Sequence, residues 1–394
     1  MPARRVIDRC LQLAQFTEEP GHITRTYLSP PMHGVHDCLT QWLRDAGCEV
    51  SIDAAGNLRG VYPAATANAP RVVIGSHLDT VPHGGAFDGI LGVVLGVALV
   101  ESLSGRRLGA EIEVIGFSEE EGVRYGTCFI GSRAVIGKID DGLLQRIRPA
   151  ILEFGLDPAA MQAAAWREKV AAYLEFHIEQ GPVLESLELS VGVVEAIAGQ
   201  TRAVVEFQGK ANHAGTTPML LRRDAVATAA EWTLFVEQMG RNTAGLVATV
   251  GALTVEPSVS NVIAGRVTAS LDNRHAADAV RRECVSRAFT AAFDIAGRRG
   301  LQCATRMIQD HAAAPMDAEL TALVESSVRA AGQSVYRMIS GAGHDAMIIG
   351  RRHPAAMLFV RSPGGISHHP DESVREHDLA AALAVGKKIL EHWS

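Results

Sequence analysis

The chain has 394 residues, of which 47% are hydrophobic and 21% are charged, and its formal net charge at pH 7 is -7. This length exceeds the size at which single hydrophobic cores stop growing, so two domains are expected. An acidic chain without a block of lysine or arginine excludes nucleic acid as an expected partner.

The cysteines and the apolar runs indicate the cellular compartment of the protein. Six cysteines are scattered along the chain without a Cys-x-x-Cys pair, which is typical of reduced thiols in a cytoplasmic protein. The N-terminal segment carries charges within its apolar pattern and lacks a signal-peptide core. The longest apolar run, Ile90 to Val100, is too short to span a bilayer. The sequence therefore predicts a cytoplasmic protein without a membrane segment.

The first part of the chain has α/β texture. Helices are expected over residues 6–16, 33–47, 90–100 and 140–167, and strands over 49–62 (a hairpin), 72–74, 111–117 and 172–178. The apolar run of residues 72–74, ended by Gly75, is typical of a buried strand. The polar, proline-rich residues 17–31 predict a loop.

The pattern changes near Gly199. Alternating strands are expected over residues 201–208, 246–255, 264–272 and 301–309, and helices over 224–240 and 278–297. This order resembles a ferredoxin-like sandwich of one antiparallel sheet and two helices. The α/β texture returns near Met316, with a strand over residues 355–360 and a closing helix. We therefore predict a catalytic α/β domain of residues 1–199 and 316–394, with a central mixed sheet flanked by helices, and an inserted α+β domain of residues 200–315.

The most informative stretch lies at the end of the strand at 72–74. His77 and Asp79 follow this strand, and a loop rich in proline and glycine leads to Asp88. In open α/β sheets, ligands bind at the carboxyl ends of strands. An imidazole and carboxylates suit a metal such as zinc or manganese. Residues two apart point to the same side, so Asp79 is expected to hydrogen-bond the back of the His77 ring.

Three other stretches place metal-competent side chains after strands or in loops. They are the run Glu119–Glu121, His177, and the pair His368 and His369. Each alone has an ordinary explanation, respectively a solvated acidic turn, a core histidine and an exposed loop pair. Their occurrence together at strand ends of one domain favours convergence on one site.

Five of these residues are enough for two ions if one carboxylate is shared. The expected ligands are His77, Asp88 and His177 for one ion, and Asp88, Glu121 and His368 for the other. Three protein ligands plus water is the open geometry of a catalytic site, and paired ions can stabilise a tetrahedral intermediate. Glu120 is the candidate general base. This donor set accepts zinc, manganese or cobalt.

The chain resembles the aminoacylase/carboxypeptidase clan of co-catalytic metallohydrolases, and within it the amidohydrolase branch that hydrolyses ureido compounds. That branch includes allantoate amidohydrolase, ureidoglycolate amidohydrolase and β-ureidopropionase-like N-carbamoyl-L-amino acid hydrolase. The matching motifs occur in order along almost the whole chain: G-S-H-L-D-T-V-P-x-G-G-x-F-D-G (75–89), E-E-G-x-R-Y-G (120–126), F-H-I-E-Q-G-P-V-L-E (176–185), H-A-G-T-T-P-M (213–219), R-R-D-A (222–225), N-V-I (261–263), D-x-R (272–274), S-G-A-G-H-D-A (340–346) and G-I-S-H-x-P-x-E (365–372).

The resemblance implies roles for individual residues. The five ligands above would hold two ions with Asp88 bridging, Glu120 would be the base, and Asp79 would orient His77. Glu119 and His369 occupy variable positions and receive no role. The substrate would be bound by His213, Asn261, Arg274, Gln180, Gly341 and Gly343. An imidazolium suits an oxyanion, and an arginine suits a carboxylate. His344, next to Asp345, either takes part in the reaction or only stabilises the loop in which it lies.

The resemblance also implies an assembly and an activity. The inserted domain would be a lid and a dimerisation surface, with His213 entering the partner's site of a homodimer. The expected reaction releases ammonia and carbon dioxide from the terminal ureido group of a small carboxylate. Allantoate is the leading substrate and N-carbamoyl-L-amino acids are second.

Two other functions are weighed against this one. The first is a dinuclear-metal peptidase or N-acyl amino acid deacylase of the same clan. Peptidase branches usually supply an acidic ligand where His177 stands, which argues against it. The second is a metal-stabilised binding protein without activity, which an intact set of ligands and an intact Glu120 disfavour.

Overall fold

The computed structural model describes residues 2–167 and 170–394. The chain divides into two compact units: unit 1 comprises residues 1–195 and 315–394, and unit 2 comprises residues 196–314. These divisions lie close to the expected domain boundaries at 199/200 and 315/316. Among the described residues, no helix combines the length and apolar character needed to cross a membrane.

The larger sheet has nine strands in the order β1-β2-β4-β3-β5-β16-β6-β14, with β15 paired to β6. Their bounds are β1 Glu49–Ile52, β2 Leu58–Tyr62, β3 Arg71–His77, β4 Glu111–Phe117, β5 Val170–Ile178, β6 Val191–Ile197, β14 Ala314–Pro315, β15 Arg337–Ser340 and β16 Ala355–Val360. Neighbours β4, β3, β5 and β16 are parallel, whereas β1–β2, β2–β4 and β16–β6 are antiparallel. The prediction of a central mixed sheet is confirmed.

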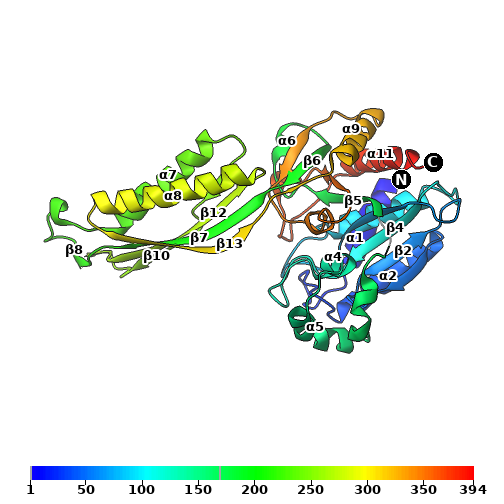
Figure 1. Cartoon of the computed structure of the whole chain (residues 1–394), viewed down its shortest axis with the longest axis horizontal. Helices are drawn as coiled ribbons and strands as arrows, with labels where there is room; N and C mark the ends of the chain where they lie inside the picture. The colour runs from blue at the N-terminus through cyan, green and yellow to red at the C-terminus, as the bar shows by residue number, and fades with distance from the viewer. Residues whose placement is uncertain (1, 168–169) are drawn as a thin grey trace. The chain divides into compact units, whose positions relative to one another are not determined.

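Helices cover both faces of this sheet (Figure 1). The helices of unit 1 are α1 Pro2–Leu13, α2 Pro31–Asp45, α3 Ile90–Glu101, α4 Ile130–Val135, α5 Asp141–Glu153, α6 Val183–Ser186, α9 Ala318–Ala330, α10 Ala346–Ile349 and α11 Glu376–Glu391. Leu174 and Phe176 of β5 join the same apolar core as α3. The alternate residue Glu175 accepts the N–H of Ala346 at α10. Because both faces are covered, most residues of the parallel strands are buried and apolar, with Glu113 and Glu175 among the buried polar exceptions.

Helix α3 is buried from Ile90 to Val100. It approaches the sheet closely at Gly92, where a Cβ atom would lie 2.1 Å from the carbonyl oxygen of Phe176. Only glycine permits this approach. Since α3 begins directly after Asp88 and Gly89, its docking fixes where Asp88 enters the site.

Two predicted elements are wrong in extent. The helix expected over residues 140–167 ends at Glu153, because Gly155 takes a left-handed conformation with φ +86°; a 3-10 segment, Pro158–Ala164, follows it. The strand expected over 246–255 is divided into β9 Val247–Thr249 and β10 Leu253–Glu256, which pair with different parts of one neighbour. Strands β6 and β15 were not predicted.

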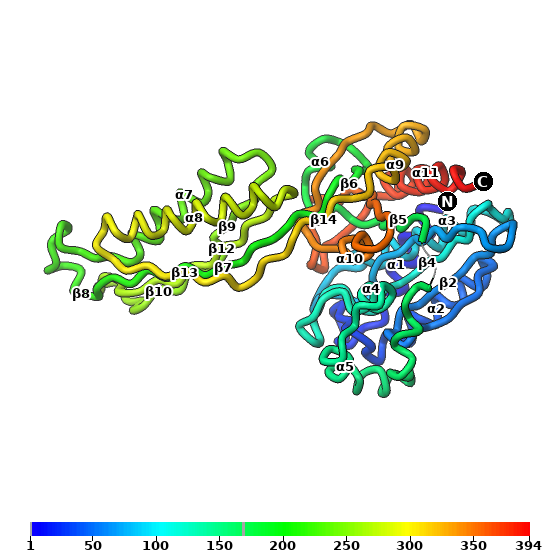
Figure 2. Tube along the Cα trace, viewed as in Figure 1, coloured from blue at the N-terminus to red at the C-terminus, as the bar shows by residue number. Residues whose placement is uncertain are grey.

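Unit 2 contains a five-stranded antiparallel sheet in the order β10-β12-β7-β13, with β9 also paired to β12. Its remaining elements are β7 Gly199–Gln208, α7 Ala225–Asn242, β12 Arg266–His275, α8 Asp278–Arg298 and β13 Gln302–His311. Helices α7 and α8 lie side by side along the sheet (Figure 2). Trp232 of α7 and Phe207 of β7 pack against each other in the core between these helices and the sheet. A separate ribbon joins β8 Asn212–His213 to β11 Val262–Ile263.

The close contact of α3 with β5 gives a test of this packing. Gly92→Ala should destabilise unit 1 by about 1–3 kcal/mol, because the new methyl group must displace backbone, despite the helix preference of alanine. Gly297→Ala in α8 is the control, since nothing lies within 4 Å of its Cβ position. That variant should be neutral or more stable by up to about 1 kcal/mol. Urea unfolding measures both, and an unchanged stability of Gly92→Ala would contradict the packing.

Candidate metal centre

The predicted metal-competent residues gather at one edge of the large sheet. His77 is the last residue of β3 and His177 lies near the end of β5. Glu120 and Glu121 follow β4, and His368 lies in the loop after β16. These four strands are adjacent and parallel, so their carboxyl ends meet at the same edge.

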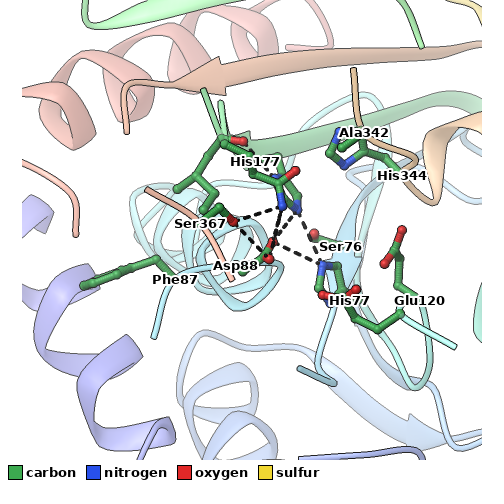
Figure 3. Close-up of polar contacts among 12 residues, drawn as sticks. Ser76, His77, Phe87, Asp88, Glu120, His177, Ala342, His344 and Ser367 are labelled. Atoms are coloured by element: carbon green, nitrogen blue, oxygen red, sulfur yellow. Dashed lines mark hydrogen bonds and ion pairs between the residues drawn. The ribbon is translucent and has the colours of Figure 1, made fainter. Parts of the chain in front are cut away.

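The carboxylate of Asp88 lies at the centre of this group (Figure 3). Its oxygens are 3.6 Å from Nε2 of His77, 3.2 Å from Nε2 of His177 and 3.1 Å from Nε2 of His368. Glu121 Oε1 lies 3.4 Å from the same nitrogen of His368. The structure thus brings together both expected ligand sets, one of His77, Asp88 and His177 and one of Asp88, Glu121 and His368.

The orientation of the rings shows that this cluster requires positive charge. Nδ1 of His77 donates to the carbonyl of Asp79 (3.0 Å) and Nδ1 of His177 donates to the carbonyl of Ile178 (2.9 Å). If both rings are neutral, each Nε2 atom carries a lone pair. The lone pairs of His77 and His177 then face each other across 3.5 Å, and both face the carboxylate of Asp88. Only added protons or a cation make this arrangement favourable. The donor types and the orphaned lone pairs fit divalent metal ions.

The pKa values of the cluster agree with this requirement. Burial opposes ionisation of Asp88, but hydrogen bonds from His177, His368 and His77 hold the pKa of its carboxyl well below the usual range. Hydrogen bonds with Asp88 and Glu121 raise the pKa of His368 to about 10. A bound cation would replace the protons that these rings otherwise take up.

Asp79 acts through different atoms from those predicted. The near partner of the His77 ring is the backbone carbonyl of Asp79, and the closest carboxylate oxygen is 3.4 Å away. The two carboxylate oxygens instead accept the backbone N–H groups of Glu120 (2.9 Å) and Glu121 (3.0 Å). Asp79 therefore orients His77 mainly through its backbone and fixes the loop after β4 through its side chain.

The carboxyl of Glu120 lies beside His77 (Figure 3), and the residue as a whole is 8% exposed. Burial raises the pKa of Glu120 well above its usual range; His77 lowers it, and Glu121 raises it further. A cation at the cluster would act in the same direction as His77. For the adjacent Glu119, burial and then Asp79 raise the pKa to about 9, so a neutral carboxyl is expected there.

Gln180 was expected to bind substrate, but its side-chain amide is already engaged. Nε2 donates to both oxygens of Asp88 (3.3 and 3.1 Å) and lies 3.1 Å from Oγ of Ser367. Its Oε1 is buried and has no hydrogen-bond partner among the described residues. The amide N–H groups therefore orient Asp88, and only the oxygen remains for another partner.

Sequence reasoning missed Glu372. This residue closes the motif G-I-S-H-x-P-x-E, and its Oε1 accepts the backbone N–H groups of Phe87 (2.8 Å) and Asp88 (2.9 Å). Its Oε2 lies 3.3 Å from Oγ of Ser367, next to His368. Glu372 thus joins the two loops that supply Asp88 and His368. The glutamate in the motif was the available signal.

His344 is buried beside the cluster and supports its own loop. Its ring stacks edge-on against that of His177 at 4.5 Å, and its Nε2 lies 2.8 Å from Oγ of Ser340. The Ser340 hydroxyl in turn bonds the backbone of Ala342. This network favours the loop-holding alternative for His344. Gly341 and Gly343 lie exposed in the same loop.

The expected substrate residues of the inserted segment lie in unit 2. Nδ1 of His213 accepts the backbone N–H groups of Gly215 (3.0 Å) and Thr216 (3.2 Å), so the ring carries its proton on Nε2. Asn261 lies next to His213 across the ribbon of β8 and β11, since its carbonyl accepts the N–H of Ala214 (3.0 Å).

Arg274 in β12 makes a two-pronged contact within its own chain. Its Nε and Nη2 donate to the two oxygens of Asp272 at 2.8 and 3.0 Å. Arg202 lies 3.1 Å from the same carboxylate. The guanidinium is therefore held in a fixed orientation by the acidic residue of the D-x-R motif.

The fold and this cluster define an α/β protein with a candidate metal centre at the carboxyl ends of parallel strands. The family model described as Peptidase family M20/M25/M40 matches residues 73–392, and the chain belongs to this family.

Relatives and solved structures agree over nearly the full length. The chain is 38% identical to "Probable allantoate deiminase" of Oryza sativa subsp. japonica, over 96% of this chain and 86% of that protein. It is 37% identical to "N-carbamoyl-L-amino acid amidohydrolase" of Geobacillus stearothermophilus, over 98% and 97%. A crystal structure of an amidase of the hydantoinase/carbamoylase family from Burkholderia multivorans has a TM-score of 0.93 at 31% identity, covering 99% of this chain and 98% of that one.

The contacts of Glu372 predict a specific defect. Glu372→Ala should weaken binding of a divalent ion about 10–100-fold, because the amides that position Asp88 lose their acceptor. Glu372→Gln keeps an acceptor oxygen for these amides. Its affinity for the divalent ion should therefore be much closer to that of the unaltered protein. Competition with a chelator of known affinity measures both. Equal affinity of Glu372→Ala and the unaltered protein would show that this carboxylate does not position the site.

Proposed function

We propose that the protein is a metal-dependent amidohydrolase that cleaves the terminal ureido C–N bond of a small carboxylate and releases ammonia and carbon dioxide. The observation that carries this proposal is the cluster around Asp88, in which His77, Asp88 and His177 are buried, with Glu120 beside it. The relatives named for allantoate and for N-carbamoyl-L-amino acids support the substrate class. Allantoate is the leading substrate, followed by N-carbamoyl-L-amino acids.

Two ions per subunit would be held by His77, Asp88 and His177 and by Asp88, Glu121 and His368, with Asp88 shared. Zinc or manganese is the expected metal, and cobalt is also compatible with these donors. Bound there, the ions would polarise the ureido oxygen and acidify water. Asp79, Gln180 and Glu372 would keep the ligands in place through the contacts described above.

Glu120 would act as the general base and then the general acid. Its carboxylate takes a proton from the attacking water as the C–O bond forms at the ureido carbon. The same carboxyl then gives the proton to the departing nitrogen as the C–N bond breaks. Ammonia leaves, and the carbamate left behind loses carbon dioxide.

The residues of unit 2 would bind the substrate. His213 offers an Nε2–H donor, because its Nδ1 already accepts two amides, and such a donor stabilises an oxyanion. Arg274, held by Asp272, would bind the substrate carboxylate, and Asn261, Gln180, Gly341 and Gly343 would supply further hydrogen bonds. Unit 2 would serve as lid and dimerisation domain, with His213 entering the partner's site.

A cytoplasmic location is part of the same proposal. It is supported by six cysteines that are all free thiols.

Ammonia release tests the function most simply. The protein, loaded with metal, should release ammonia from allantoate, ureidoglycolate or an N-carbamoyl-L-amino acid. Glu120→Gln should lower kcat by about 10²–10⁴-fold while metal content stays constant, because only the proton acceptor is lost. No ammonia from any of these compounds would refute the ureido reaction and direct assays to peptides and N-acyl amino acids. A retained rate in Glu120→Gln would refute the base.

Mixing two inactive variants tests the role of His213. His213→Ala should lower kcat about 10²–10³-fold through loss of an oxyanion donor. If His213 enters the partner's site, a hybrid dimer of His213→Ala with Glu120→Gln has one intact site and one doubly defective site. When the subunits of the two variants exchange at random without unfolding, about a quarter of all active sites should then be intact and active. A mixture that stays as inactive as its components would place His213 in its own subunit's site.

A further inference from the structure

A second group of metal-competent side chains lies outside the centre around Asp88. Glu19, His22 and His83 each offer a ligand atom, and these atoms lie within 4.8 Å of one another. Oε2 of Glu19 is 2.8 Å from Nε2 of His83. The rings of His22 and His83 stack with centroids 4.1 Å apart and planes inclined by 19°. All three residues are exposed, so an ion can reach them directly from solvent.

The turn that carries Glu19 and His22 is closed by Thr17. Its Oγ1 donates to the carbonyl of His22 (2.7 Å) and accepts the N–H groups of Glu19 (3.2 Å) and Thr24 (3.0 Å). The N–H of His22 also donates to the carbonyl of Glu19 (3.1 Å). The backbone at Glu19 and His22 is therefore held by contacts that need no ion.

His83 comes from the loop between Asp79 and Asp88, and hydrogen bonds hold this loop against the turn. The N–H of His83 donates to Oγ1 of Thr24 (3.0 Å). The N–H of Gly84 donates to the carbonyl of Ile23 (2.9 Å). Because both segments are already aligned, binding an ion orders little additional chain, which favours affinity.

We propose that Glu19, His22 and His83 bind one divalent transition-metal ion of the zinc class, separate from the centre around Asp88. Two imidazoles and one carboxylate leave further coordination positions open to water. Magnesium and calcium prefer oxygen ligands, so this set selects against them. The ion takes the place of the hydrogen atom between Nε2 of His83 and the carboxylate of Glu19, and a neutral His83 ring then carries its proton on Nδ1.

Such an ion would join two segments that are distant in sequence. It would tie the turn of residues 17–24 to the loop that ends in Asp88, and so restrain the loop that supplies a central residue of the other centre. The inference rests on the contacts of Glu19, His22 and His83 alone and does not depend on the proposed reaction.

The number of zinc ions bound per chain at two concentrations of free zinc tests this proposal. Equilibrium dialysis of the full chain against nanomolar and then micromolar free zinc should show one more equivalent at the higher concentration. His22→Ala and His83→Ala should each lose this equivalent and keep the ions bound at nanomolar zinc. His392→Ala, which removes an exposed histidine near the C-terminus, is the matched control and should keep every equivalent.

A charge-removing variant separates metal binding from local structure. Glu19→Gln can still accept the hydrogen bond from His83 but lacks the negative charge, and it should weaken the additional zinc equivalent about tenfold. A large excess of magnesium should not displace this zinc. The same number of equivalents in the unaltered protein, His22→Ala and His83→Ala would overturn the proposal, as would displacement by magnesium.

Discussion

The candidate centre depends on one buried carboxylate that three imidazole rings share. Asp88 is 4% exposed, and its oxygens lie 3.1–3.6 Å from the three Nε2 atoms. Two of these rings turn their lone pairs inward because backbone carbonyls accept their Nδ1 protons. A buried group of this kind is stable only when positive charge balances it. The need for positive charge therefore follows from the backbone at the ends of β3 and β5 as much as from the side chains.

The surrounding structure can be understood as support for Asp88. Helix α3 starts one residue after Gly89, and its contact with β5 fixes the position of the loop. Gln180 holds the carboxylate and Glu372 holds the backbone at the same residue. The carboxylate of Asp79 fixes the loop that carries Glu120. Asp79 and α3 follow β3, Gln180 follows β5 and Glu372 lies in the loop after β16, so the geometry of the centre depends on several strands of the sheet.

The sequence was sufficient for the large features of this arrangement and insufficient for its finer contacts. Apolar runs ended by glycine or polar residues predicted β3, β4, β5 and β16, and the ligand set followed from what stands at their ends. Strands β6 and β15 were missed. The role of Asp79 was assigned to its carboxylate, because spacing gives the side of a strand but not whether a backbone carbonyl is nearer. Glu372 could not be placed, since its partners are about 285 residues away in the chain and only the folded loops bring them together.

Counting the tightly bound ions in two variants tests the central claim most directly. Asp88→Ala removes the shared carboxylate, and we expect this variant to retain neither ion after dialysis at nanomolar free metal. His368→Ala removes a ligand from only one set, and this variant should retain one ion. If Asp88→Ala still holds two ions with the affinity of the unaltered protein, Asp88 is not shared between them and the account of the centre is contradicted.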